Sequence, residues 1–197
     1  MNNLPSGFPA AYDGRYVRLA TARLEDAATI ARLRNAARHC FLNDDAVTTD
    51  QVIQWLQTMH FPTEALLRIE SPTGALLGFA GWNQLDMERR EAEIGRLMID
   101  AQAVLQHIDN PHRQDIAVDA VRAIGHYLYT RLGLQRIHTA YIAGNHHAAR
   151  VNRRCGMQAV TTEVYARRDG TEVRLIRLSL DIQDWRTLQS IWAQEAS

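Results

Sequence analysis

Two basic side chains, His112 and Arg113, stand directly before a helical pattern, and this arrangement suits the binding of an anion. The first turn of a helix presents unpaired N–H groups and the positive end of the dipole, and both attract phosphate. Arg113 adds a planar fork of donors. The segment 110–128 (NPHRQDIAVDAVRAIGHYL) has almost no glycine, which usually allows close backbone approach. It therefore predicts either a phosphate site with reduced backbone contact or a capped helix start of structural use.

Metal and thiol chemistry have little support in the sequence. His146 and His147 are adjacent, so on a helix they point about 100° apart and cannot form an i, i+4 metal pair. Cys40 and Cys155 are too few for a disulfide framework or a zinc site. Both cysteines have apolar neighbours, and we expect buried thiols. The sequence predicts no metal site and places the two histidines at the surface.

The composition indicates one domain over residues 1–197, with an N-terminal extension at 1–14 and a C-terminal helix at 183–197. A chain of 197 residues that is 46% hydrophobic can bury a sizeable core. Its 22 basic and 22 acidic residues create no global field for nucleic acid or an anionic membrane, so neither is expected as a partner. No window approaches the ~20 apolar residues of a spanning helix. We expect a cytoplasmic protein.

Period-two and period-3.6 patterns alternate along the chain and define the elements that must position these residues. Strands are expected at 16–20, 65–71, 75–86, 91–100, 137–144, 157–166 and 171–180, and helices at 24–37, 48–59, 116–132, 146–155 and 183–197. The polar stretch 101–114 is expected to connect a strand to a helix without an element of its own. A late strand–helix–strand unit among hairpins predicts an α+β fold with some parallel pairing.

An ordered run in the second half of the chain resembles the GNAT superfamily of acyl-CoA-dependent N-acyltransferases. The run consists of LGLQRI at 132–137, then Asn145, then AARVNRRCGM at 148–157. The resemblance extends from about Tyr16 to Trp185. It implies a mixed, mostly antiparallel sheet of six to seven strands flanked by helices, in which the family's fourth and fifth strands are splayed apart.

Three further segments resemble particular parts or branches of that superfamily. EAEIGRLMID at 91–100 resembles the fourth strand. The closing segment 167–185 is similar to the branch that contains ribosomal-protein N-terminal acetyltransferases, whereas TTDQVIQWL at 48–56 resembles a segment of some amino-sugar N-acetyltransferases. The two branch resemblances imply different acceptors.

The resemblance implies acetyl-CoA, or another acyl-CoA, as co-substrate. Its pantetheine arm would lie between the splayed strands, on Leu97, Met98 and Ile99, with the N–H groups of Met98 and Ile99 facing it. The same segment would otherwise be a simple buried strand.

The pyrophosphate loop of the family falls at the start of the helix described first. The positions carried over are His112, Arg113, Gln114, Asp115, Ile116 and Ala117. Arg113 and Asp115 replace residues that should be glycine, so the loop is degenerate, and repulsion between Asp115 and a phosphate could cost on the order of 1 kcal/mol. We therefore expect low acetyl-CoA affinity or a different donor.

Three residues are carried over as catalytic, and each has a structural alternative. Glu93 is the candidate general base, ahead of Glu91, although both could be the exposed start of a strand and a water chain could take the proton. Asn145 would bond the pantetheine amide or orient a water, and it could also cap the following helix. Asn152 stands where many relatives have a proton-donating tyrosine. An amide donates protons poorly, so Asn152 could only hydrogen-bond CoA or a water.

Three hypotheses for function follow. The chain is an acyl-CoA-dependent N-acyltransferase, a GNAT-fold enzyme with another donor such as a carrier-protein thioester, or a catalytically silent binding module. The acceptor would be a small-molecule or peptide amine, and the protein a monomer or homodimer. Candidates for acceptor contacts are Arg38, His39, Asp44, Asp45, Trp82 and Tyr165.

Overall fold

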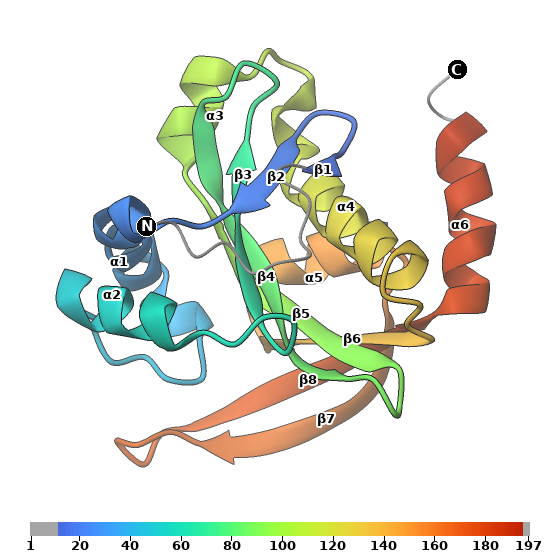
Figure 1. Cartoon of the computed structure of the whole chain (residues 1–197). Coiled ribbons are helices and arrows are strands. Elements are labelled where there is room, and N and C mark those ends of the chain that lie inside the picture. The colour runs from blue at the N-terminus through green and yellow to red at the C-terminus, as the bar shows by residue number, and fades with distance from the viewer. Residues whose placement is uncertain (1–11, 195–197) are drawn as a thin grey trace.

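One mixed sheet runs through the computed structural model, which describes residues 12–194. In that part of the chain eight strands follow the spatial order β1-β2-β3-β4-β5-β6-β8-β7 (Figure 1). The strands are β1 Tyr12–Asp13, β2 Arg18–Thr21, β3 Ala65–Glu70, β4 Leu76–Asp86, β5 Glu91–Ile99, β6 Arg136–Ile142, β7 Gln158–Ala166 and β8 Glu172–Asp181. Only β5 and β6 pair in parallel within it. The α+β class is confirmed, with the two-residue β1 added to the six to seven strands predicted.

Helices cover both faces of the sheet (Figure 1). They are α1 Ala27–Ala36, α2 Thr49–Thr58, α3 Ala101–His107, α4 Ile116–Thr130, α5 His146–Arg154 and α6 Ile182–Gln194. α1 and α2 lie against one face, and α4, α5 and α6 lie on the other. The extension predicted at 1–14 is described only from residue 12, and the helix predicted at 183–197 only to residue 194.

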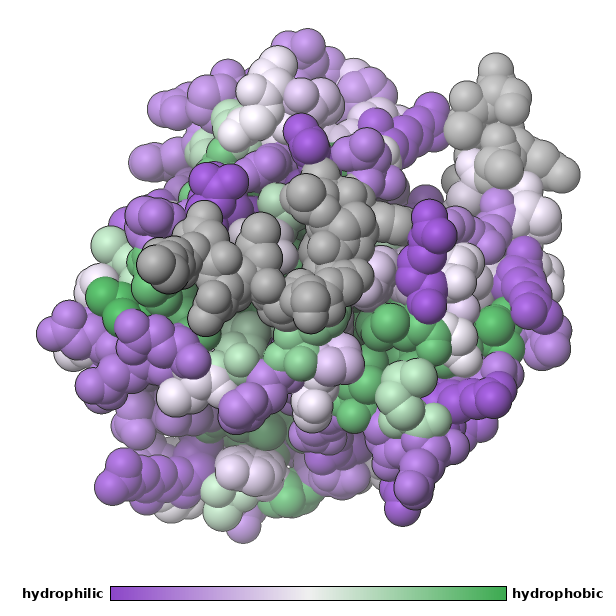
Figure 2. Space-filling view, viewed as in Figure 1, coloured by the Kyte–Doolittle hydropathy of each residue, from purple (hydrophilic) through white to green (hydrophobic). Residues whose placement is uncertain are grey.

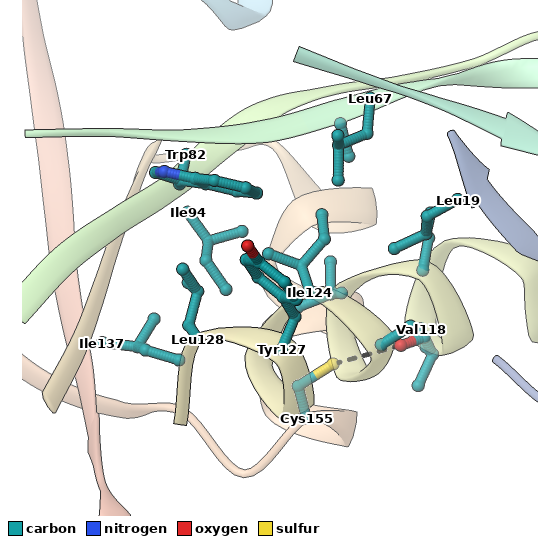
Figure 3. Packing of buried hydrophobic residues seen from close by; sticks show 14 of the residues in the cluster. Leu19, Leu67, Trp82, Ile94, Val118, Ile124, Tyr127, Leu128, Ile137 and Cys155 are labelled. Carbon is teal, nitrogen blue, oxygen red and sulfur yellow. Dashed lines mark hydrogen bonds between the residues drawn. The ribbon is translucent and has the colours of Figure 1, made fainter. Parts of the chain in front are cut away.

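Alternating side chains of the strands build two hydrophobic clusters, one on each face. On the α4 face, Trp82 stacks on Tyr127 with ring centroids 5.6 Å apart (Figure 3). On the α1–α2 face, Phe79 packs with Leu66. Trp82 is fully buried, and its indole N–H donates to the Pro62 carbonyl at 2.8 Å. The expectation that Trp82 contacts an acceptor is therefore wrong, because the ring fills the core beneath α4.

Helix α3 is an element that the sequence pattern did not predict. The Asp100 carboxylate caps its start by accepting hydrogen bonds from the amides of Gln102 at 3.1 Å and Ala103 at 3.2 Å. Val104 and Ile108 are the residues that it buries in the core. One such pair, an i, i+4 contact, is too little to produce a periodic signal.

The two cysteines differ in burial. Cys155 is buried beside the Val118 carbonyl, and this desolvation raises the pKa of its thiol to about 12 (Figure 3). Cys40 is only half-buried. The prediction of a buried thiol is confirmed for Cys155 alone.

Hydrophilic side chains dominate the face in Figure 2, with smaller hydrophobic patches between them. Within residues 12–194, none of the helices combines the length and the hydrophobicity that crossing a bilayer requires.

Candidate active site

The two parallel strands at the centre of the sheet separate after a short paired region. In the described chain β5 and β6 pair at three positions, Glu91 with Arg136, Ala92 with Ile137 and Glu93 with His138. β5 then continues to Ile99 and β6 to Ile142 without pairing to each other. The strands therefore enclose a V-shaped gap, whose apex lies at the Glu93–His138 pair.

A β-bulge in β5 accompanies this separation. In the register with β4, a single residue, Ala80, lies opposite both Arg96 and Leu97. Arg96 has a φ of 56°, a left-handed conformation found at such bulges. The extra residue reverses the alternation, so that Ile94 packs toward α4 while Met98 packs toward α1 and α2. The bulge turns the far half of β5 away from β6.

The direction of the β5 amides follows from one hydrogen bond at the end of the strand. The Asp100 N–H donates to the Leu77 carbonyl at 2.8 Å. Because successive N–H groups point to opposite sides of a strand, the Met98 amide faces β4, and those of Leu97 and Ile99 face the gap. The N–H groups expected to face the gap were those of Met98 and Ile99. The alternation agrees for Ile99, but it turns the Met98 amide away from the gap and the Leu97 amide toward it.

A cavity of about 340 Å³ lies at the apex. Its polar lining comes from β4 to β8 and consists of Gln84, Glu91, Glu93, Arg136, His138, Thr139, Thr161, Arg177 and Ser179. Ala92 and Ile94 face α4, so Glu91 and Glu93 project from the opposite face of β5, on the side of α1 and α2. The carboxylates and the imidazole in this cavity can bind an amine and accept its proton, and two guanidinium groups, of Arg136 and Arg177, lie beside them.

Ion pairs organise the charges around this cavity. Glu93 lies 3.7 Å from the Arg177 guanidinium, which also donates to Glu163 at 2.8 Å. The Glu91 carboxylate contacts the imidazole Nε2 of His138 at 3.1 Å. Both predicted carboxylates are therefore at the apex, and each already has a partner.

Sequence analysis missed several polar residues of the cavity, and His138 is the one among them that can accept a proton. In IHTAYIAG it is one polar position in an alternating strand, a pattern that says nothing of chemistry. What marks His138 as a site residue is its register: it pairs with Glu93 on the parallel strand, and Glu91 is the next residue on the same face of that strand. That register depends on the fold.

Asn145 and Asn152 belong to the helix that follows β6. The Asn145 side chain accepts the Ala148 amide at 3.0 Å and caps α5, which is the structural role expected for it. Asn152 is buried, with 7% of its surface exposed, while His146 and His147 are exposed. In the part of the chain that the structure describes, no three acidic, histidine or cysteine side chains are grouped to hold a metal ion.

The start of α4 has its charges engaged within the protein. The guanidinium of Arg113 donates to the Ile108 carbonyl at 2.7 Å and the Leu105 carbonyl at 2.9 Å, at the end of α3. The Asp115 carboxylate accepts from Arg154 at 2.6 Å, and the His112 ring stacks on Tyr16. Gln114 lies in the same single turn, and Ile116 and Ala117 open the helix.

The turn between β7 and β8 contacts the loop that follows α1. The Arg167 guanidinium donates to the carbonyls of His39 at 2.9 Å and Phe41 at 3.0 Å. It also pairs with Asp44 at 3.1 Å. The hairpin thus brings together two of the segments expected to shape the acceptor site.

Known proteins provide an independent comparison. The family described as "Acetyltransferase (GNAT) domain" matches residues 17–158. A search of curated proteins finds no match.

Three solved structures share the fold. A GCN5-related N-acetyltransferase from Brucella melitensis has 16% identity and a TM-score of 0.75, with 98% of this chain and 90% of that chain covered. Spermidine N-acetyltransferase from Vibrio cholerae, in complex with CoA and spermine, has 17% identity and a TM-score of 0.70, covering 86% and 98%. A nucleotide-linked sugar GNAT has 13% identity and a TM-score of 0.72, covering 93% and 96%.

Proposed function

The chain belongs to the GNAT family of acetyltransferase domains, and on that premise we propose that it transfers an acetyl or other acyl group from acyl-CoA to a primary amine. The observation that carries the proposal is the gap between β5 and β6. Pairing stops after Glu93 and His138, so both strands offer main-chain groups along its sides. An extended arm can bind such an edge as an added strand would.

The residues beside the gap fit a pantetheine arm. The amides of Leu97 and Ile99 can donate to its carbonyls, and Met98 supports them from the α1–α2 core. Asn145 and Asn152, at the start and in the body of α5, supply amide groups at the open end of β6. When bound, acyl-CoA supplies an activated thioester carbonyl, and the chain contributes orientation and proton transfer.

Transfer to an amine requires the cavity at the apex. The amine must lose a proton as its nitrogen bonds to the acyl carbon, and Glu93 and the His138–Glu91 pair are the groups placed to receive it. One structural relative, the spermidine N-acetyltransferase, was crystallised with CoA and spermine, a ligand of the amine class proposed. The acceptor would approach from the side of α1, α2 and the β7–β8 hairpin.

The start of α4 is expected to bind the diphosphate of CoA more weakly than a glycine-rich loop would. Arg113 already donates to two carbonyls and Asp115 already accepts from Arg154, so neither basic side chain is free for phosphate, and Asp115 places a carboxylate at the start of the helix. This observation favours a second candidate, a donor that presents its thioester on a carrier protein and needs no diphosphate contact.

Calorimetric titration with CoA and acetyl-CoA tests the first candidate. We expect binding with a Kd of about 10 to 500 µM, within the usual range for enzyme substrates. Acyl transfer would then be followed by mass spectrometry with spermidine, an amino sugar and a peptide that has a free N-terminus. No binding at millimolar CoA, together with transfer from an acylated carrier protein, would select the second candidate.

A further inference from the structure

We propose that His138, held by Glu91, accepts the proton of the attacking amine at the apex of the gap. The inference rests on the proposed acyl transfer and assigns one of its steps. It gives a role to an imidazole–carboxylate pair that lines the cavity.

The placement of the pair is the first argument. Glu91 and His138 come from neighbouring parallel strands, within the last three residue pairs before those strands separate. The imidazole Nε2 lies 3.1 Å from a Glu91 oxygen, with 37% and 25% of the two side chains exposed. Partial exposure leaves the ring accessible to a substrate, while both strands fix its position.

The chemistry of the pair is the second argument. When Nε2–H donates to Glu91, the other ring nitrogen, Nδ1, carries the lone pair that accepts a proton. The carboxylate fixes this tautomer and stabilises the imidazolium that forms, as an orienting acid does for other catalytic histidines. Imidazole is also the side chain best suited to proton exchange near neutral pH.

The step balances without any further reactant. The amine lone pair attacks the thioester carbonyl, a C–N bond forms, and the N–H proton moves to Nδ1 of His138. The C–S bond then breaks, and its electron pair leaves with the thiolate. The imidazolium returns the proton to the thiolate or to water, which restores the neutral ring.

Glu93 is less free to perform this step. Its carboxylate faces the Arg177 guanidinium at 3.7 Å, and Glu163 holds that guanidinium at 2.8 Å. An incoming amine would compete with Arg177 for the carboxylate, so Glu93 is better suited to orient the acceptor.

Other charged groups around His138 also have partners. On its own strand, Arg136 donates to Asp181 of β8 at 2.6 Å. Arg89 lies 3.8 Å from Glu91, before the start of β5. On β8, Arg177 faces the cavity, and β7 contributes Glu163 beside it. The proton acceptor among these groups is the imidazole.

Replacing His138 by alanine, with imidazole added back, tests the proposal. In the variant H138A we expect CoA binding to stay within about threefold and kcat to fall about 10²- to 10³-fold, the usual contribution of a general base. Added imidazole should restore activity about tenfold or more, because it can enter the space left by the ring and accept the proton. The pH profile of kcat should also differ between H138A and the wild type.

Two matched variants separate a proton acceptor from a positioning residue. E91Q keeps the shape but loses the carboxylate, and we expect kcat to fall about tenfold without rescue by imidazole. E93Q should mainly raise the KM for the amine and keep the pH dependence of kcat.

The measurements on the wild type and on the variants test acyl transfer and the role of His138 separately. If the wild-type protein neither binds CoA nor acylates any of the three amines, the proposed function fails and this assignment with it. If the wild type is active and H138A retains at least a third of its kcat, or if E93Q alone removes the pH dependence, the assignment to His138 is overturned while acyl transfer stands.

Discussion

At the apex of the gap, charged side chains contact one another across strands and border a cavity. At the start of α4, by contrast, Arg113 is bound to two carbonyls and Asp115 to the Arg154 guanidinium. Both regions flank the path that a thioester donor would follow. The cavity at the apex keeps space and proton-accepting side chains, whereas Arg113, Asp115 and Arg154 join α3, α4 and α5 to one another.

Filling the apex should have the largest effect. A Cβ atom built on Gly95 meets no atom within 4 Å, and the residue projects on the same face as Glu93. The substitution G95F should therefore fold normally and reduce kcat/KM about 100-fold or more by displacing the reacting groups. G95A is the matched control and should stay within about threefold. Full activity in G95F would place the reaction elsewhere.

Removing Arg113 tests whether the start of α4 is structural. R113A loses two charge-assisted hydrogen bonds to the end of α3 and should lower the free energy of unfolding by about 2 kcal/mol. Chemical denaturation measures this loss. The Kd for CoA should change less than threefold, and a large rise in Kd at unchanged stability would instead make Arg113 a phosphate ligand.

Neutralising Asp115 should strengthen the weaker region. D115N removes a carboxylate near the expected diphosphate and releases Arg154, so CoA should bind about fivefold more tightly, or about 1 kcal/mol. Titration at low salt measures the change, with D109N at an exposed neighbouring acid as control. Weaker binding in D115N would show that the Asp115–Arg154 pair builds the site.

The smallest effect concerns the junction between the two regions, where β5 passes into α3. Hydrogen bonding from Arg32, with the amides of Ala103 and Gln102, holds the pKa of Asp100 below its usual value. Because the folded state favours the ionised form, this stabilisation is present above the pKa of the unfolded chain and is lost as pH falls through the folded pKa. D100N should cost about 0.5–1 kcal/mol at pH 7, because it removes the charge that pairs with Arg32 and that interacts with the dipole of α3.

Urea denaturation at pH 7 and pH 3 checks the sign of this prediction. The difference between D100N and the wild type should shrink at the lower pH. A difference that is equal at both values would mean that the charge of Asp100 contributes nothing.

Local periodicity predicted most of the fold. Two apolar runs around a glycine-containing turn indicated the strands at 65–71 and 75–86, an apolar stripe indicated the helix from Ile116, and all three formed. Ile94 is buried and Leu97 is partly buried on the same face of the sheet, and the two positions are an odd number apart, as the bulge between them requires.

What the sequence could not supply depends on contacts between distant segments. His138 gains its partner only through the parallel register of β5 and β6, and nothing nearby in the sequence indicates Glu91. Arg113 is a residue type that commonly binds phosphate. In the fold its guanidinium instead donates to carbonyls at the end of α3, a helix too short to predict from the sequence. Trp82 was expected among the acceptor contacts because the sequence does not show that α4 covers its ring, which stacks on Tyr127.

Amide hydrogen exchange, measured by NMR with and without CoA, tests whether the gap between β5 and β6 receives the pantetheine arm. We expect the amides of Leu97 and Ile99 to exchange rapidly in the free protein and to become protected when CoA binds, while the Met98 amide is protected in both states because it faces β4. Protection of Leu97 and Ile99 without CoA, or their unchanged exchange at saturating CoA, would contradict a gap that receives the pantetheine arm.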